Sequence, residues 1–171
     1  MRDRSWRGSQ GGASPLELIV SVVLFAIFLI VFMQRAFYYQ AVAEKTALEM
    51  TVANMRTGLR YKVADLMLKN RMSEIPTLAD ENPMNWLEER PENYIGTFDG
   101  PPQSDTAGKW YYDRHGHELV YTVNNRRHFV PLDGRSFDVR YRPTRVQTGG
   151  EGPNAQVWVS LVQVQGYEWL P

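Results

Sequence analysis

Hydrophobic residues are concentrated in one stretch near the N-terminus of the chain. Over Leu18–Met33 the only polar side chain is Ser21. A helix from Ala13 to Met33 would be about 31 Å long, which matches the roughly 30 Å hydrocarbon core of a bilayer. Residues 13–34 are therefore predicted to form a membrane-spanning helix. Three arginines precede this helix, and a basic flank predicts a cytoplasmic N-terminus with the rest of the chain across the membrane.

Beyond Arg35 the apolar residues recur every three or four positions, as on one face of an amphipathic helix. The predicted stripe is Val42, Glu49, Val52, Met55, Leu59, Val63 and Leu66, with one charged member. No proline occurs over Val20–Ile75, so we expect one helix from about Ser14 to about Lys69, packed through this stripe on a sheet. Gly58 weakens that helix by about 1 kcal/mol relative to alanine, a cost that packing can override.

The connection after this helix, residues 71–108, carries weaker signals. Asn82-Pro83 is typical of a helix cap and first turn, and it predicts a short helix over MNWLEER that ends before Pro91. Tyr94–Gly108 contains an Asp-Gly-Pro-Pro sequence, so this segment is predicted to be a loop.

After Gly108 the apolar residues alternate as they do in β-strands. Lys109–Tyr112 and Glu118–Val123 flank the turn sequence DRHGH and predict a hairpin. The other strand candidates are Arg126–Val130, Ser136–Arg142, with Phe137, Val139 and Tyr141 facing inward, and Gln156–Gln165, which is the longest; Gln147–Pro153 is predicted to be a loop. Four or five antiparallel strands packed on the long helix give an α+β fold.

Composition and motifs narrow the classes of function. The formal net charge is zero, with 19 basic and 19 acidic residues, which gives no support for nucleic-acid binding. The chain has no cysteine, so disulfides and thiolate chemistry are excluded. It also has no G-x-S-x-G sequence and no glycine-rich phosphate loop. We therefore expect neither an enzymatic activity nor a cofactor.

Some polar clusters are candidates for metal binding. Asp113, His115, His117 and Glu118 lie within six residues. Their spacing matches no standard zinc site, and their position favours a solvated polar turn. Asp99 and Asp105 offer oxygen ligands for calcium, but two carboxylates six positions apart are weak evidence, and no metal site is predicted.

Two further sets of residues are candidates for binding a partner. Arg126-Arg127-His128 is interpreted as a solvated strand edge, because charges at an edge discourage unwanted pairing. Trp158, Tyr167 and Trp169 either anchor a partner or close the sheet against the helix, and the second interpretation is favoured.

A single carboxylate, Glu17, stands at the start of the apolar segment. Gly12-Ala13-Ser14-Pro15-Leu16-Glu17 followed by an apolar helix resembles the type IV pilin-like family, which includes pilins, minor pilins and the pseudopilins of type II secretion. The resemblance implies that a prepilin peptidase cuts after Gly12 and methylates Ala13, and that Glu17 becomes the fifth residue. Many major pilins of this family have a helix-breaking glycine and proline in this helix. The corresponding positions here are Ala26 and Gln34, which favours a minor subunit.

The resemblance also implies an organisation and partners. Residues 1–12 are a prepilin leader, 13–34 the transmembrane and assembly helix, and 35–171 an extracytoplasmic pilin-like domain with the remainder of the helix. The implied partners are other pilin-like subunits, the prepilin peptidase and an inner-membrane assembly platform. The implied location is a bacterial inner membrane with a periplasmic domain, and then a pilus or pseudopilus. A carboxylate near the bilayer core is costly unless paired, and the family implies that Glu17 meets the N-terminus of a neighbour.

A second resemblance lies in the C-terminal part of the chain. GKWYYDRHGHELVYTVNN and NPMNWLEERPENYIG are similar to segments of proteobacterial minor pilin-like proteins, including those of mannose-sensitive haemagglutinin type pili.

Three alternatives remain open. Ser14-x-x-Glu17 is a capping box with Pro15 at the first helical position, so local capping also explains Glu17. Ala41-Val42-Ala43 offers a signal-peptidase site, and cleavage there would give a mature start at Glu44. The chain would then be a secreted extracytoplasmic binding protein or enzyme. Without cleavage, and with Met1 intact, the apolar helix would be a plain signal anchor of such a protein, which gives Glu17 no role. Alternatively, a pilin-like frame carries a sheet domain that acts as an adhesive tip.

Overall fold

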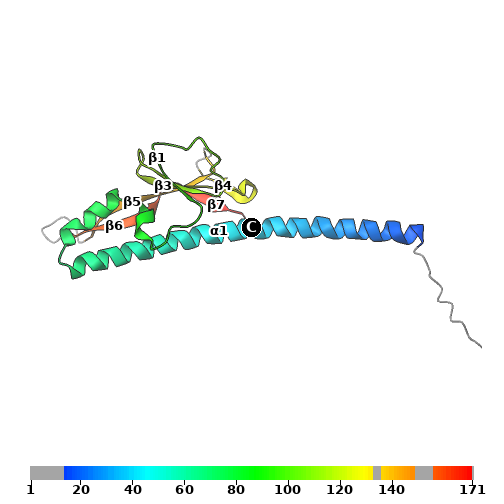
Figure 1. The fold of residues 1–171 in the computed structure, drawn as a ribbon, viewed down its shortest axis with the longest axis horizontal. Coiled ribbons are helices and arrows are strands. Elements are labelled where there is room, and N and C mark those ends of the chain that lie inside the picture. Colours follow the sequence, from blue (N-terminus) through cyan, green and yellow to red (C-terminus); the bar gives the residue numbers. More distant parts are fainter. Residues whose placement is uncertain (1–13, 133–135, 149–155, 171) are drawn as a thin grey trace, which may run out of the picture. The chain divides into compact units, whose positions relative to one another are not determined.

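The computed structural model describes residues 14–132, 136–148 and 156–170, which form two compact units, Met1–Tyr39 and Gln40–Pro171. The helix α1 covers Pro15–Leu68 and contributes to both units (Figure 1). These bounds confirm the predicted helix over residues 14–69. The strands and the shorter helices all belong to the second unit. The α+β fold class is therefore confirmed.

In the second unit α1 buries one stripe of side chains: Ala41, Leu48, Val52, Met55, Leu59 and Val63. The prediction is correct from Val52 onward and wrong before it, because Val42 and Glu49 are exposed. Leu48 lies four residues before Val52 and Ala41 seven before Leu48, and these spacings keep both residues on the buried face of a 3.6-residue helix.

Two short 3₁₀ helices follow α1, η1 (Met72–Asp80) and η2 (Pro83–Trp86). The predicted cap is confirmed, because Asn82 Oδ1 accepts a hydrogen bond from the Met84 backbone N–H at 3.0 Å. The predicted helix over MNWLEER is wrong beyond Trp86. Leu87 already has an extended backbone with φ −83° and ψ 145°, so the helix ends after a single turn.

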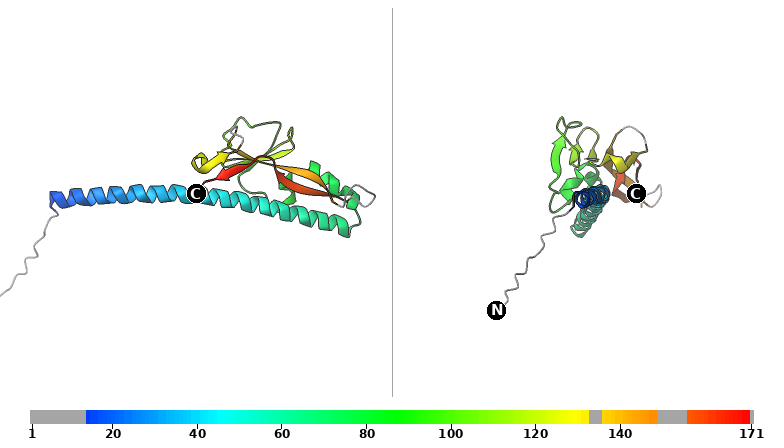
Figure 2. Two further views of the ribbon diagram at one scale, coloured as in Figure 1. Left: turned by 180° about the vertical axis from the view of Figure 1, so that it is seen from behind. Right: turned by 90° about the vertical axis from the view of Figure 1, so that its right-hand side faces the viewer.

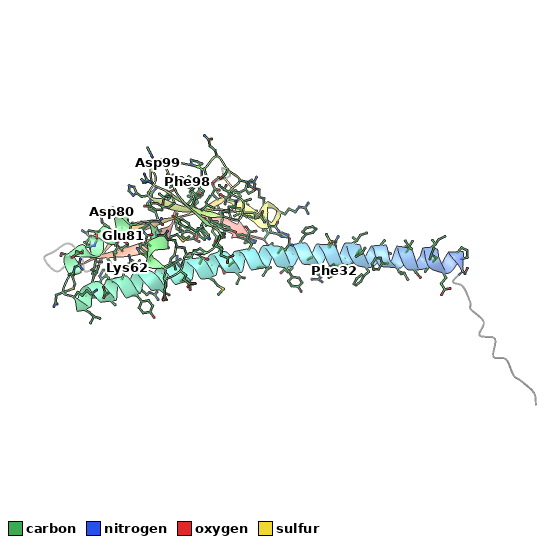
Figure 3. The ribbon with its side chains drawn as sticks, in the orientation of Figure 1. Phe32, Lys62, Asp80, Glu81, Phe98 and Asp99 are labelled. Carbon is green, nitrogen blue, oxygen red and sulfur yellow. The ribbon has the colours of Figure 1, made fainter. Side chains whose placement is uncertain are left out.

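The Glu81 carboxylate joins this connection to α1. It accepts hydrogen bonds from Lys62 Nζ at 2.9 Å and from Trp86 Nε1 at 3.2 Å (Figure 3). Trp86 itself is buried. The connection is therefore a packed part of the second unit.

A five-stranded sheet has the order β1-β2-β3-β5-β6. Its strands are β1 (Tyr94–Phe98), β2 (Trp110–Asp113), β3 (Glu118–Thr122), β5 (Asp138–Thr148) and β6 (Gln156–Gln163). The predicted hairpin is confirmed as β2 and β3, and all neighbouring strands are antiparallel except β1 and β2.

The predictions for Tyr94–Phe98 and for the longest strand are wrong. Tyr94–Phe98 was expected to be loop, but it is β1, which runs parallel to β2. Gly96 in this strand has φ +116°, a conformation that glycine adopts readily and other residues rarely do. The longest strand is β5 with 11 residues, not β6 with eight.

A second sheet consists of β4 (Phe129–Pro131) and β7 (Tyr167–Trp169). The predicted strand over Arg126–Val130 is therefore wrong at its start, because Arg126–His128 form the 3₁₀ helix η3. The centroid of the Phe129 ring lies 5.2 Å from the ring centroid of Tyr167 and 5.3 Å from that of Trp169.

The core joins one sheet face to the second part of α1, which runs beneath the sheet (Figure 2). Sheet residues in this core are Trp110, Tyr112, Leu119, Tyr121, Val139, Tyr141, Val159 and Leu161. Trp158, Tyr167 and Trp169 pack against it, which confirms the favoured interpretation of these aromatics. Phe137 is 39% exposed, so its predicted inward position is wrong. The Arg126 guanidinium lies over its ring at 5.2 Å.

Candidate functional site

The first half of α1 exposes a continuous apolar surface. Every large apolar side chain in Leu16–Met33 exposes at least 42% of its surface, including Phe32 (Figure 3). Among the described residues, α1 is the one helix long and apolar enough to cross a membrane. Because soluble proteins rarely expose large contiguous apolar areas, this surface indicates contact with lipid or with other protein.

Glu17 lies in the first turn of α1, as the sequence predicts. It is exposed, and no charged side chain other than Glu17 occurs between Ser14 and Gln34. The Ser21 hydroxyl donates to the Glu17 backbone carbonyl at 2.8 Å, so this nearby hydroxyl is occupied by the helix itself. Within the described part of the chain, the Glu17 carboxylate has no ion-pair partner. The other two predicted site residues, Gly12 and Ala13, lie outside the described residues.

Two of the four candidate metal ligands, Asp113 and Glu118, are engaged in other contacts. Asp113 Oδ1 accepts hydrogen bonds from the backbone N–H groups of Gly100 and His115, at 3.1 and 3.0 Å. Glu118 is buried and paired with Arg140 and Arg142. Over residues 14–132, 136–148 and 156–170, no three His, Asp or Glu side chains are grouped to hold a metal ion.

The two acidic residues of the loop before β2 act separately. Asp99 lies 3.4 Å from the guanidinium of Arg114. Asp105 Oδ1 accepts a hydrogen bond from the Ala107 backbone N–H at 3.1 Å. The two carboxylates therefore have different partners: Asp99 faces the turn after β2, and Asp105 bonds within its own stretch of loop.

Glu44 of α1 makes a contact that no sequence pattern predicted. Its Oε1 accepts hydrogen bonds from the Tyr121 hydroxyl at 3.0 Å and the Asn124 backbone N–H at 2.6 Å, and its Oε2 accepts one from the Asn125 backbone N–H at 2.9 Å. Burial and the neighbouring Glu44 carboxylate both raise the pKa of Tyr121. Glu44 thus fixes the turn after β3 to the helix. The turn signal Asn124-Asn125 was visible in the sequence, but its partner was not.

Replacement of Glu44 by glutamine is expected to lower the free energy of unfolding by about 1–3 kcal/mol. The Gln amide group places an N–H₂ donor opposite a backbone N–H donor, so at least one hydrogen bond of this partly buried set is lost. The measurement is urea unfolding of the full chain in detergent micelles, followed by tryptophan fluorescence. Glu49→Gln is the matched control, because Glu49 makes one exposed contact, 4.0 Å from Lys45, worth less than about 1 kcal/mol. Equal effects of the two variants would contradict the role of Glu44.

Comparisons with protein-family models, with curated proteins and with solved structures found no match to this chain.

Proposed function

We propose that the protein is a non-enzymatic, minor pilin-like structural subunit. It is made as a membrane-inserted precursor, cut after Gly12 by a prepilin peptidase, and assembled into a type IV pilus or a type II secretion pseudopilus. The observation that carries the proposal is the exposed apolar surface of Leu16–Met33, with Glu17 as its only charge. This combination fits a helix that leaves lipid to join a bundle of like helices.

The energetics of that transfer are favourable for the apolar side chains. Burial of the apolar surface is kept when neighbouring helices replace lipid, so leaving the membrane costs little hydrophobic free energy. The carboxylate is the exception, because a charge in a low-dielectric environment needs a partner. Cleavage after Gly12 creates an ammonium group on Ala13, and in a filament the ammonium of an adjacent subunit would meet Glu17.

Processing also changes the charge of the chain. Residues 1–12 carry three arginines and one aspartate. Their removal leaves 16 basic and 18 acidic side chains, a formal net charge of −2 on the side chains. The basic flank that holds the precursor's N-terminus at the cytoplasmic surface is thereby removed.

The position of Ala41–Ala43 supports retention of the apolar helix. This segment lies inside α1, and Ala41 is buried in the second unit. A cut after Ala43 would place Glu44 at the new N-terminus, next to a cationic α-amino group that competes for its carboxylate. The proposal therefore favours one continuous helix over a cleaved secretory signal.

Mass analysis of the mature N-terminus tests the proposal. The full chain is produced in bacteria with and without a prepilin peptidase, and the purified protein is digested and sequenced by mass spectrometry. We expect N-methylated Ala13 as the first residue only when the peptidase is present. An intact N-terminal dozen residues in the functioning protein would indicate a signal-anchored binding protein or enzyme instead, and a start at Glu44 would indicate a secreted one.

A further inference from the structure

The strand β6 forms one edge of the five-stranded sheet in the described part of the chain. Ten residues from Gln156 to Gln165, QVWVSLVQVQ, contain no charge, no proline and no glycine. Natural proteins usually protect an exposed sheet edge with charged residues, proline or a bulge, because a bare edge pairs with other strands. The composition of β6 is therefore that of a strand that accepts a partner.

The direction of the backbone groups of β6 follows from three contacts. Val164 N–H donates to the Arg140 carbonyl of β5 at 2.8 Å. Leu161 lies opposite Pro143, which has no N–H to donate. The backbone groups of this pair do not bond each other, and the Leu161 carbonyl accepts from Arg56 Nη2 of α1 at 3.5 Å. In an antiparallel pair alternate residues point both backbone groups outward, so the N–H and C=O of Val157, Val159 and Leu161 face away from β5.

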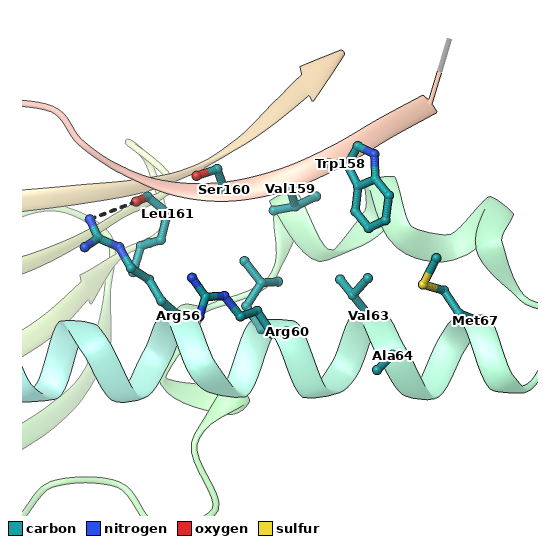
Figure 4. Close-up of a pocket in the computed structure, with 10 residues that line it drawn as sticks. Arg56, Arg60, Val63, Ala64, Met67, Trp158, Val159, Ser160 and Leu161 are labelled. Carbon is teal, nitrogen blue, oxygen red and sulfur yellow. Dashed lines mark hydrogen bonds between the residues drawn. The ribbon is translucent and has the colours of Figure 1, made fainter. Parts of the chain in front are cut away.

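This outward edge lines a groove between α1 and β6, of about 340 Å³ (Figure 4). Four consecutive residues of β6, Trp158–Leu161, line it. Because successive side chains point to opposite faces of a sheet, four consecutive lining residues indicate that the strand edge itself forms the wall. A neighbouring hollow, which shares Met67 and Trp158, extends the groove toward Val157 and η1.

The charges of the groove indicate what it binds. Arg56 and Arg60 line it, and none of the described lining residues of the groove or its extension is acidic. Among the described residues Arg60 has no hydrogen bond or ion pair, and the one hydrogen bond of Arg56 is the 3.5 Å contact with the Leu161 carbonyl. Within the part of the chain that the structure describes, these two guanidinium groups beside an uncharged strand edge therefore have no carboxylate partner.

We propose that the β6 edge binds an extended segment of another polypeptide that carries carboxylate side chains. The segment adds a strand beside β6 through the outward backbone groups, and its carboxylates pair with Arg56 and Arg60. The β6 edge of a second copy is a poor occupant, because that strand has no acidic residue and lies beside the second copy's own Arg56 and Arg60. This inference goes beyond the proposed function and does not depend on processing at Gly12.

Binding of two labelled peptides tests the inference. The acidic peptide is Thr-Val-Glu-Val-Glu-Val-Thr, and the basic peptide has lysine in place of glutamate. Fluorescence anisotropy is measured with the full chain in neutral detergent micelles. We expect the acidic peptide to bind at least tenfold more tightly than the basic one, and we expect the double variant Arg56→Glu/Arg60→Glu to reverse this order.

Two further variants separate strand addition from simple charge attraction. Val157→Pro removes an outward N–H without removing a bond to β5, and it should weaken acidic-peptide binding at least tenfold. Arg90→Glu/Arg114→Glu makes the same change in net charge near the opposite edge of the sheet, and it should leave binding unchanged. The arginine variants alter exposed side chains, so the charge test stands even if Val157→Pro fails to fold.

Three results would overturn the inference. Equal binding of the two peptides would remove the role of the arginines. Acidic-peptide binding that survives in a folded Val157→Pro protein would show that the groove is not a strand-addition site. A concentration-dependent dimer that Val157→Pro abolishes would assign the edge to a second copy of the chain.

Discussion

Replacement of Gly58 by alanine is expected to destabilise the second unit by about 3 kcal/mol, at the upper end of the usual cost of overpacking. A Cβ atom at this position would lie 2.1 Å from the backbone oxygen of Trp86 and 2.9 Å from its carbonyl carbon. Both are backbone atoms of η2, so no side-chain rotation relieves the overlap. Trp86 is also held by its own burial and by the bond from Nε1 to Glu81. The helix or η2 must therefore move, and the packing between them is lost.

The sign of this effect makes it a sharp test. At an exposed position inside a helix, glycine to alanine stabilises by about 1 kcal/mol, whereas here the contact with Trp86 reverses the expectation. The free energy of unfolding is measured on the full chain in detergent micelles with urea. The matched control is Ala47→Gly at an exposed position of α1, which should cost about 1 kcal/mol through propensity alone. A more stable Gly58→Ala protein would show that α1 and η2 do not approach this closely.

The same residue illustrates what the sequence could and could not predict. The length of α1 followed from its apolar content, its periodicity and the lack of proline, which are local properties. Gly58 could be read only as a weakness of that helix. Glycine is needed at this position because the helix approaches the backbone of Trp86. Trp86 lies 28 positions later, and no local pattern contains that information.

The wrong strand predictions also concern pairing between residues that are distant in the sequence. The strand predicted over Ser136–Arg142 stops before Pro143, but β5 continues to Thr148. The ladder between β3 and β5 extends only to the pair Leu119 and Tyr141, so Pro143 lies beyond it and its missing N–H leaves no β3 acceptor unpaired. Strand β1 also could not be predicted from local sequence. It is short, contains Gly96 and pairs in parallel with a strand that begins 12 residues after its end.

Some features of the candidate site could be predicted from the sequence and others could not. The apolar run and the place of Glu17 in the first turn depend on neighbouring residues, and both were predicted. The contact between Glu44 and the turn at Asn124 joins residues 80 positions apart. Such a contact depends on how the helix and sheet pack, and a single sequence does not reveal it.

Replacement of Glu17 by glutamine is expected to reduce incorporation into filaments at least tenfold, while cleavage after Gly12 continues. On the proposed function, the carboxylate pairs with the ammonium group of a neighbouring subunit within a bundle of apolar helices. Removing one partner of a buried pair typically costs about 3–5 kcal/mol, because the other charge stays buried. The measurement is the fraction of the protein in sheared filaments relative to membranes, and N-terminal mass analysis of the same samples confirms processing. Glu49→Gln, which removes an exposed carboxylate of α1 outside the apolar segment, should leave incorporation unchanged.

The choice of glutamine separates the two explanations of Glu17. A capping box accepts glutamine as well as glutamate at its fourth position, so Glu17→Gln keeps the cap and removes only the charge. Glu17→Ala removes both. If charge pairing governs assembly, the two variants should fail to a similar degree. Normal incorporation of Glu17→Gln together with loss in Glu17→Ala would instead assign Glu17 to capping alone. The ammonium group created by cleavage at Gly12 would then have no carboxylate partner in this chain's apolar helix.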